Sequence, residues 1–442
     1  MSNKNTIRVA EFEKLYYDDT KPFKQKHWEA LCRYLEQQNK KEFGRIEYYR
    51  ILNKGIQFTN YVGVIQAGNL TIEVLPKTDR EKTTAANLVV DKLETEDSQK
   101  RQSWHDVLLK MLKECRLLQV SHVDYASLNL KSNSILEIYL ELFLEQTQKL
   151  LHEGLVKKYK KKEGNTLAMK GQMLFSKNIS HNLIHQERFY VRHTEFNRNN
   201  IFNQLLYKTL YLIAAISSNT SVTDKTNRLL LDFPEMPDCK VTSATFDKLV
   251  YDRKTERYKE AILISKMLLL NYRPDITGGS ENVIAILFDM NELWEEFVYR
   301  RLVKSAEEGV QISRQNKKPF WYNKNDDYYK KVKPDIVVTK NERTIILDTK
   351  WKIVDDNRPA DDDLKQMFVY NLLWNAEQSL LIYPGSHKNC EGSYLHFDLS
   401  KPRKKDEKEE FFNHCSLAFI DLLDSNVRLV SVEPFYNLLK GL

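Results

Sequence analysis

Two acidic residues and a lysine lie on two short apolar runs in the last third of the sequence. Asp335 follows a proline at the start of the first run, and Asp348 and Lys350 end the second. Both runs are rich in β-branched residues and flank a polar break, which predicts a β-hairpin. If Asn341 and Glu342 form a two-residue loop, Asp335 lies directly opposite Asp348, with Cβ atoms about 4.5–5.5 Å apart. Lys350 returns to the same sheet face by the period of two.

This arrangement is suited to hydrolysis of phosphodiesters. Two carboxylates so close repel each other unless a cation lies between them. Oxygen ligands suit Mg²⁺, which takes one or two protein carboxylates together with water and substrate phosphate. A bound Mg²⁺ ion stabilises the charge that develops at phosphorus and lowers the pKa of the attacking water. We therefore predict Asp335 and Asp348 as metal ligands, with Lys350 positioning the water or neutralising a phosphate oxygen.

A third acid, Glu295, precedes the hairpin within a predicted long helix over 281–308. On a helical wheel it lies among apolar residues: Ile284, Phe288, Val298 and Leu302. A buried carboxylate in such a stripe needs a partner or a metal ion. We predict Glu295 as a third metal-binding acid, direct or through water. The alternative is a structural carboxylate bonded to backbone N–H groups.

The helix predicted after the hairpin, over 361–375, carries Gln366 and Tyr370 one turn apart. Residues four apart lie on one helical face. An amide and a phenol facing a carboxylate cluster can orient a substrate phosphate or support the metal ligands. We therefore include Gln366 and Tyr370 in the predicted catalytic set.

Two basic segments allow either of two interpretations. The segment around 314–333 mixes basic residues with aromatic ones: Arg314, Lys317, Lys318, Lys330, Lys331 and Lys333 with Phe320, Trp321, Tyr322, Tyr328 and Tyr329. It fits a nucleic-acid surface or a β-loop with a charged rim. The run 157–162 contains five lysines. We expect it to be a solvated helix end, with contact to phosphates or an acidic partner as the alternative.

Length and composition describe a protein of several domains. The chain has 442 residues, with 42% hydrophobic and 29% charged residues and a net charge of +7, which excludes a disordered chain. Its five cysteines are dispersed without C-x-x-C pairs, which argues against a zinc site or a disulfide framework and favours a cytoplasmic location. No apolar stretch reaches membrane-spanning length, and no phosphate-binding P-loop motif is present. Any nucleotide-driven motor must therefore be another chain.

Hydrophobic periodicity divides the chain into three regions. We predict a β-rich region over 1–100, a mainly helical region over 101–275, and a mixed α/β domain over 276–442. The predicted helices are 24–40, 104–118, 133–152, 197–217 and, after a charged linker at 401–410, 411–424. The predicted strands are 61–65, 70–76, 310–314, 334–340, 344–350, 379–383 and 394–398.

Several segments outside the hairpin form a recognisable combination. The first is Leu287-Phe288-Asp289-Met290-Asn291-Glu292-Leu293-Trp294-Glu295-Glu296-Phe297-Val298. The others are Ile72-Glu73-Val74-Leu75-Pro76-Lys77, Lys170-Gly171-Gln172-Met173-Leu174-Phe175-Ser176, Arg188-Phe189-Tyr190 and Glu195-Phe196. Together these segments resemble the McrC proteins, the nuclease subunits of McrBC-type modification-dependent restriction systems, from about residue 55 to 385.

The resemblance implies a C-terminal PD-(D/E)xK nuclease domain, preceded by a β-rich and helical partner-binding region in a multidomain α+β chain. Its catalytic set would be Asp335, Asp348 and Lys350, with Glu295 as the helix acid and Gln366/Tyr370 as the Q-x-x-x-Y element. It also implies a hexameric AAA+ partner, McrB, whose GTP hydrolysis this chain would stimulate. GTP would be bound by the partner and not by this chain.

We therefore expect the nuclease subunit of a type IV restriction complex for antiphage defence. It would cut modified double-stranded DNA, expected to contain methylcytosine, in a Mg²⁺-dependent reaction. The alternative is a non-catalytic activator of the AAA+ GTPase with a nuclease-like DNA-binding domain.

Overall fold

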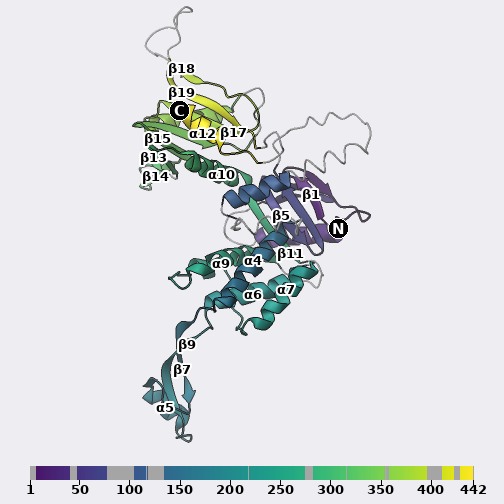
Figure 1. Cartoon of the computed structure of the whole chain (residues 1–442), viewed down its shortest axis with the longest axis vertical. Coiled ribbons are helices and arrows are strands. Elements are labelled where there is room, and N and C mark those ends of the chain that lie inside the picture. Colours follow the sequence, from purple (N-terminus) through teal and green to yellow (C-terminus); the bar gives the residue numbers. More distant parts are fainter. Residues whose placement is uncertain are drawn as a thin grey trace, which may run out of the picture.

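The computed structural model describes residues 6–39, 47–76, 104–115, 117, 134–217, 219–273, 282–314, 316–352, 354, 358–395, 411–422 and 429–441. The molecule is elongated (Figure 1), with a β-finger at one end, a helical region and an N-terminal sheet in the middle, and a C-terminal sheet at the other end. None of the helices in the described part is both long and apolar enough to span a bilayer.

A five-stranded sheet in the order β1-β6-β5-β11-β10 forms the N-terminal core. Its strands are β1 (Thr6–Ala10), β5 (Tyr61–Ala67), β6 (Leu70–Leu75), β10 (Tyr272–Arg273) and β11 (Val283–Asp289). Helix α1 (Gln25–Asn39) packs on it, and β2 (Lys14–Tyr16), β3 (Tyr49–Leu52) and β4 (Gly55–Phe58) form a small sheet beside it. The chain approaches itself closely at Gly63, where φ is +138° and a Cβ atom would lie 2.2 Å from the Ile286 carbonyl oxygen. Only glycine fits there.

Glu73 is the buried acid of the Ile72–Lys77 segment, and its contacts give a structural reason for an acid at this position. Its carboxylate forms an ion pair with Arg8 at 2.9 Å and accepts the backbone N–H of Ile135 at 2.9 Å. Ile135 is the first residue of α4, so Glu73 satisfies one of the N–H groups that a helix start leaves unpaired. The side chain thus joins strand β6 to the helical region. Lys77, the last residue of the segment, lies outside the described residues.

The helical region packs its apolar stripes into a core shared with both sheets. Its helices are 104–114, α4 (Ile135–His152), α6 (Ile201–Ile216), α7 (Thr220–Asp232), α8 (Ser243–Asp247) and α9 (Lys259–Asn271), with the 3₁₀ turn η1 (Glu256–Tyr258). Asn200 and Asn219 cap α6 and α7, where each side chain accepts a backbone N–H, as asparagine does at helix starts. The predicted helices 104–118, 133–152 and 197–217 correspond to 104–114, α4 and α6, whereas α7, α8 and α9 were not predicted. Residues 118 and 133 lie outside the described part.

A β-finger projects from this region (Figure 1). It consists of β7 (Lys158–Thr166), β8 (Gln172–Met173), α5 (Phe175–Asn182) and β9 (Phe189–Asn197), with strand order β7-β9-β8. The finger was not predicted from the sequence, and the expectation of a helix end over 157–162 was wrong, because four of the five lysines lie on strand β7. Gly171 has φ +71° and no room for a Cβ atom, which would lie 2.5 Å from the Arg192 carbonyl oxygen. The finger fold therefore explains the glycine of the 170–176 segment.

The C-terminal sheet has six strands in the order β12-β15-β16-β17-β19-β18. They are β12 (Val310–Arg314), β15 (Ile336–Lys340), β16 (Arg343–Thr349), β17 (Gln378–Pro384), β18 (Ser393–Leu395) and β19 (Phe411–Ile420). One face, with Ile336, Val338, Ile345 and Leu347, packs in the core that also contains residues of α10 (Met290–Ser305) and α12 (Glu433–Gly441). The other face, with Val337 and Ile346, packs on α11 (Asp361–Trp374). A separate two-stranded ribbon, β13 (Lys318–Asn323) and β14 (Tyr328–Val332), leads into the sheet.

Two predicted helices were wrong. The range 281–308 is strand β11 followed by α10, because the β-branched apolar run at 283–288 pairs with β5 and Asp289 starts the helix by accepting the backbone N–H of Asn291. Short apolar runs do not distinguish strand from helix by periodicity. The range 411–424 is strand β19 over 411–420, which pairs in parallel with β17. The predicted linker 401–410 and the end of the strand predicted at 394–398 lie outside the described residues.

Besides their shared core, the N-terminal sheet and the C-terminal sheet are joined at two places among the described residues. Strand β11 continues directly into α10, and Asn60 beside it donates to the Asp289 side chain at 2.9 Å. Separately, the Trp351 indole N–H donates to the Glu11 carboxylate at 2.7 Å, and both side chains are buried. Strand β11 falls in the range predicted for the third region, so the predicted boundary at 276 does not coincide with a boundary between the two sheets.

Candidate active site

The predicted hairpin forms with the predicted register. Lys340 pairs with Arg343 and Ile336 with Leu347, so the next pair outward is Asp335 with Asp348. Asn341 and Glu342 have φ of 50° and 68°, and positive φ at both loop residues is what a type I′ hairpin turn requires. The alternation of strand residues then places Asp335, Asp348 and Lys350 on the face that packs against α11.

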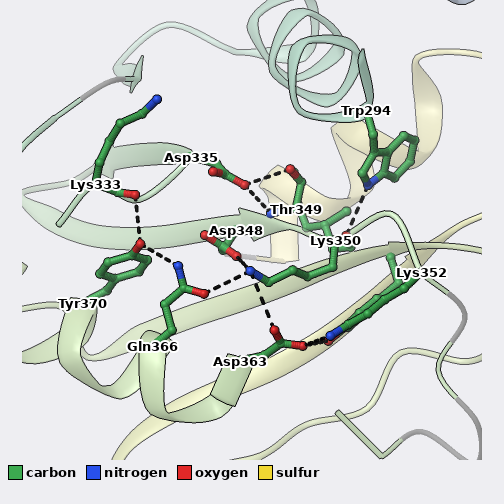
Figure 2. Close-up of polar contacts among 12 residues, drawn as sticks. Trp294, Lys333, Asp335, Asp348, Thr349, Lys350, Lys352, Asp363, Gln366 and Tyr370 are labelled. Carbon is green, nitrogen blue, oxygen red and sulfur yellow. Dashed lines mark hydrogen bonds and ion pairs between the residues drawn. The ribbon is translucent and has the colours of Figure 1, made fainter. Parts of the chain in front are cut away.

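Asp335 is held by the opposite strand. Its Oδ2 accepts the backbone N–H of Thr349 at 2.7 Å and the Thr349 hydroxyl at 2.8 Å. Figure 2 shows both contacts at the edge of the acid pair. The two donors fix the orientation of the Asp335 carboxylate and leave its other oxygen available for a ligand.

Lys350 connects the acid pair to helix α11. Its Nζ lies 2.7 Å from Asp348 Oδ2 and donates to Gln366 Oε1 at 3.0 Å. Gln366 Nε2 donates to the Tyr370 hydroxyl at 2.7 Å, and that hydroxyl donates to the Lys333 carbonyl oxygen at 2.8 Å. The chain of contacts in Figure 2 thus joins the strand end, the helix and the end of ribbon strand β14. Four of the six predicted site residues, Asp348, Lys350, Gln366 and Tyr370, lie in this network, and Asp335 lies opposite Asp348 on the neighbouring strand.

Burial and mutual repulsion set the charge of the acid pair. Burial, together with the neighbouring Asp335, raises the pKa of Asp348 to about 7, against the effect of Lys350. Burial alone would lower the pKa of Lys350, but Asp348, together with Asp363 and Asp335, raises it. Lys350 is therefore a cation at neutral pH. The site presents a fixed positive charge beside carboxylates that are costly to ionise together.

Tyr370 stays protonated at neutral pH, because burial raises its pKa to about 12. A protonated phenol can donate a hydrogen bond, which is the role that the contact to Lys333 requires. Gln366 and Tyr370 therefore support Lys350 and the end of β14 rather than facing the acids directly.

Glu295 is the one predicted site residue that neither joins this network nor lies opposite one of its members. It lies on α10, which covers the opposite face of the sheet, and no hydrogen bond or ion pair to it is found within the described part of the chain. Burial and then the charge of Asp335 raise the pKa of Glu295. The carboxylate is thus half-buried and within electrostatic reach of Asp335.

The donor set fits a hard divalent cation held by two carboxylates. Among the described residues, no three His, Cys, Asp or Glu side chains are close enough to form a ready metal cluster. Mg²⁺ needs only one or two protein carboxylates, since water and substrate phosphate complete its shell. The opposed pair Asp335 and Asp348 meets that need.

Two site residues were missed by the sequence analysis. Thr349 lies between Asp348 and Lys350 in the sequence and donates to Asp335. Its position between the acid and the lysine could have indicated a role at the site. Asp363, in the first turn of α11, lies 3.7 Å from Lys350 and forms an ion pair with Lys352. Its only signal was the group of three acids at 361–363, which equally describes an ordinary helix start.

The fold and the site together describe a multidomain protein of mixed α and β structure with a carboxylate–lysine site on its C-terminal sheet. The sequence profile described as "McrBC 5-methylcytosine restriction system component" matches residues 56–384. The chain belongs to this family, which confirms the resemblance drawn from the sequence. No curated protein matches the chain.

Two solved structures from Thermococcus gammatolerans are similar in fold. One is described as a refined half-complex from a tetradecameric assembly of McrB AAA+ hexamers with bound McrC. It matches with a TM-score of 0.69 and 19% identity over 99% of this chain and 100% of the other. The other is a cryo-EM structure of the McrBC complex, with a TM-score of 0.51 and 19% identity over 69% of this chain and 89% of the other.

Proposed function

We propose that this chain is the McrC-type nuclease subunit of a GTP-dependent restriction complex and that its C-terminal sheet is a PD-(D/E)xK nuclease domain. The observation that carries the proposal is the hairpin that opposes Asp335 and Asp348 and places Lys350 2.7 Å from Asp348. The substrate would be double-stranded DNA with modified, methylcytosine-containing sites, and the enzyme would be cytoplasmic.

Each residue has a distinct task in this reaction. Asp335 and Asp348 would hold Mg²⁺, with Glu295 acting through water, and the bound ion would polarise phosphate and lower the pKa of water. Lys350 orients the attacking water or offsets negative charge on a phosphate oxygen. Thr349 keeps the Asp335 carboxylate in place, and Gln366 and Tyr370 keep Lys350 in place. This support restricts the lysine to one direction, which favours attack from a defined position.

The finger is the surface we propose for contact with an McrB-like AAA+ GTPase hexamer. It exposes large apolar side chains far from any core: Tyr159, Leu167, Phe175, Leu183 and Ile184 are 71–88% exposed. Apolar side chains grouped on the outside of a protein mark interaction sites. The similar structures are described as McrB hexamers with bound McrC, and a partner that binds GTP would supply the nucleotide site whose motif this sequence lacks.

The test is cleavage of methylated and unmethylated plasmid with Mg²⁺, the AAA+ partner and GTP, each omitted in turn. Cutting should require all three, and Asp348→Ala should reduce it by about 10³-fold or more while stimulation of the partner GTPase stays intact. Asp362→Ala is the matched control, since its side chain is 97% exposed on the same helix as Gln366. Loss of cutting and of GTPase stimulation together would contradict the separation of the two sites.

The second candidate function is a non-catalytic activator of the GTPase with a nuclease-like DNA-binding domain. The observation that favours it is the ion pair of Lys350 with Asp348, which occupies a carboxylate that a metal ion would need. Stimulation of the GTPase without cleavage of DNA in any modification state would establish it. Mg²⁺ binding by the full chain that is lost in Asp335→Ala would argue against it.

A further inference from the structure

The ribbon formed by β13 and β14 has more exposed aromatic surface than a structural hairpin needs. Its five aromatic side chains are between 41% and 56% exposed: Phe320, Trp321, Tyr322, Tyr328 and Tyr329. An isolated two-stranded hairpin is marginally stable in water, and these side chains contribute little to a core. The exposed aromatic surface therefore indicates contact with another molecule.

The charge of the ribbon indicates a polyanion. Residues 317–333 contain six lysines and two aspartates. The aspartates, Asp326 and Asp327, lie in the tip and accept hydrogen bonds from Asn323 at 2.7 Å and from Tyr322 at 3.1 Å. None of the six lysines forms an ion pair with a residue in the described ranges. The strands, and not the tip, thus present positive charge to phosphates.

The register distributes these side chains over both faces of the ribbon. Trp321 pairs with Lys330, and Tyr322 pairs with Tyr329, their rings stacked at 4.5 Å. Trp321, Tyr328 and Lys330 therefore lie on one face, and Tyr322, Tyr329 and Lys331 lie on the other. A surface that stacks single-stranded bases uses one face of a sheet. A ribbon with both faces in solvent fits instead between two walls, and the major groove of B-DNA admits a two-stranded ribbon.

The base of the ribbon is fixed beside the active site. Lys318 Nζ donates to the Leu373 carbonyl oxygen at 2.8 Å and lies 4.9 Å from the Trp374 ring centroid. At the end of the second strand, the Lys333 carbonyl accepts the Tyr370 hydroxyl, and Asp335 follows two residues later. Any duplex held by the ribbon is thus held at a fixed offset from the acid pair.

We propose that the β13–β14 ribbon inserts into the major groove of duplex DNA next to the cut site. Lysines on each face contact the phosphates of one wall, and the aromatic side chains contact base edges and sugars. The proposal rests on the proposed nuclease function for its substrate, but it concerns binding and not hydrolysis.

The experiment measures binding of the full chain to a fluorescent duplex and to a single strand of equal length, over a range of KCl, in EDTA without partner. Lys330→Ala/Lys331→Ala should weaken duplex binding and reduce the slope of log K against log salt by about 2. The control Lys240→Ala/Lys248→Ala removes two exposed lysines of the helical region and should leave the slope unchanged. An unchanged slope in the ribbon variant overturns the proposal, as does a chain that does not bind the duplex at low salt.

Aromatic substitutions test insertion between two walls. Trp321→Ala and Tyr329→Ala, one on each face, should each weaken duplex binding by at least about fivefold. The slope of log K against log salt should stay unchanged, because no charge is removed. Tyr211→Ala on α6 is the control for an exposed aromatic side chain. Methyl green in the major groove should compete, and netropsin in the minor groove should not. The proposal is overturned if only one of the two substitutions weakens duplex binding, if netropsin alone competes, or if the single strand binds more tightly than the duplex.

The result is independent of cleavage. A chain that binds through the ribbon but never cuts keeps this inference and refutes the proposed function. If the chain cuts DNA but the ribbon variants bind the duplex as tightly as the unaltered chain, this inference is refuted and the proposed function is kept.

Discussion

The β-finger and the C-terminal sheet, at opposite ends of the molecule (Figure 1), use the same residue types in opposite ways. On the finger, ion pairs such as Lys177–Glu163 and Lys162–Glu195 lie in solvent, and large aliphatic side chains are exposed. In the C-terminal sheet the aliphatic side chains are buried, and a carboxylate, Asp348, is buried with them. Exposed aliphatic surface suits binding of a protein, whereas a buried acid suits chemistry. The comparison therefore supports the proposed partner contact at one end and the proposed catalysis at the other.

The largest effect should come from the buried acid. Without metal, folding raises the pKa of Asp348 from 3.8 to about 7, so the folded state binds more protons than the unfolded state between these values. Its contribution to stability therefore falls as pH rises from about 4 to 7, by about 4 kcal/mol at most. Asp348→Asn should remove this loss, so in EDTA at pH 8 the variant should be the more stable protein in urea unfolding. Equal stability at pH 8 would mean that burial of the acid carries no cost.

An intermediate effect is expected at the finger. Ile184→Asp places a charge on a side chain that is 88% exposed, so the fold should tolerate it. Contact with the partner should weaken by about 30-fold if Ile184 is a central contact. GTPase stimulation as a function of chain concentration measures this. The control Leu231→Asp changes a residue that is 86% exposed on α7. An equal loss of GTPase stimulation in this control would contradict partner contact through the finger.

The smallest effect should come from the charges of the finger. Glu163→Gln breaks contacts to Lys177 and Arg192, both solvent-exposed pairs, and exposed pairs contribute about 0–1 kcal/mol. The melting temperature should therefore shift by a few degrees at most and by less in high salt. A larger loss of stability would place Glu163 in a cooperative network and weaken the contrast between the two ends.

The site was more predictable from the sequence than the molecule around it. A two-residue turn and the period of two suffice to oppose Asp335 and Asp348, and a helical turn suffices to align Gln366 and Tyr370. Glu295 was placed by a helical wheel that included Ile284 and Phe288, which lie on strand β11, so that argument failed although the residue is near Asp335. The finger was missed because β7 is mostly exposed and rich in lysine, so its sequence has no apolar alternation that predicts a strand.

The two joints between the N-terminal sheet and the C-terminal sheet restrict how these parts can move. A body attached at one point can swivel in any direction, whereas a second attachment and a shared core remove most of that freedom. The passage from β11 into α10 is one attachment, and the hydrogen bond between Glu11 and Trp351 is another. Trp351 follows Lys350 in the chain, so this second attachment lies one residue from the carboxylate–lysine site. The proposed catalytic lysine is therefore anchored next to a point at which the two sheets are tied together.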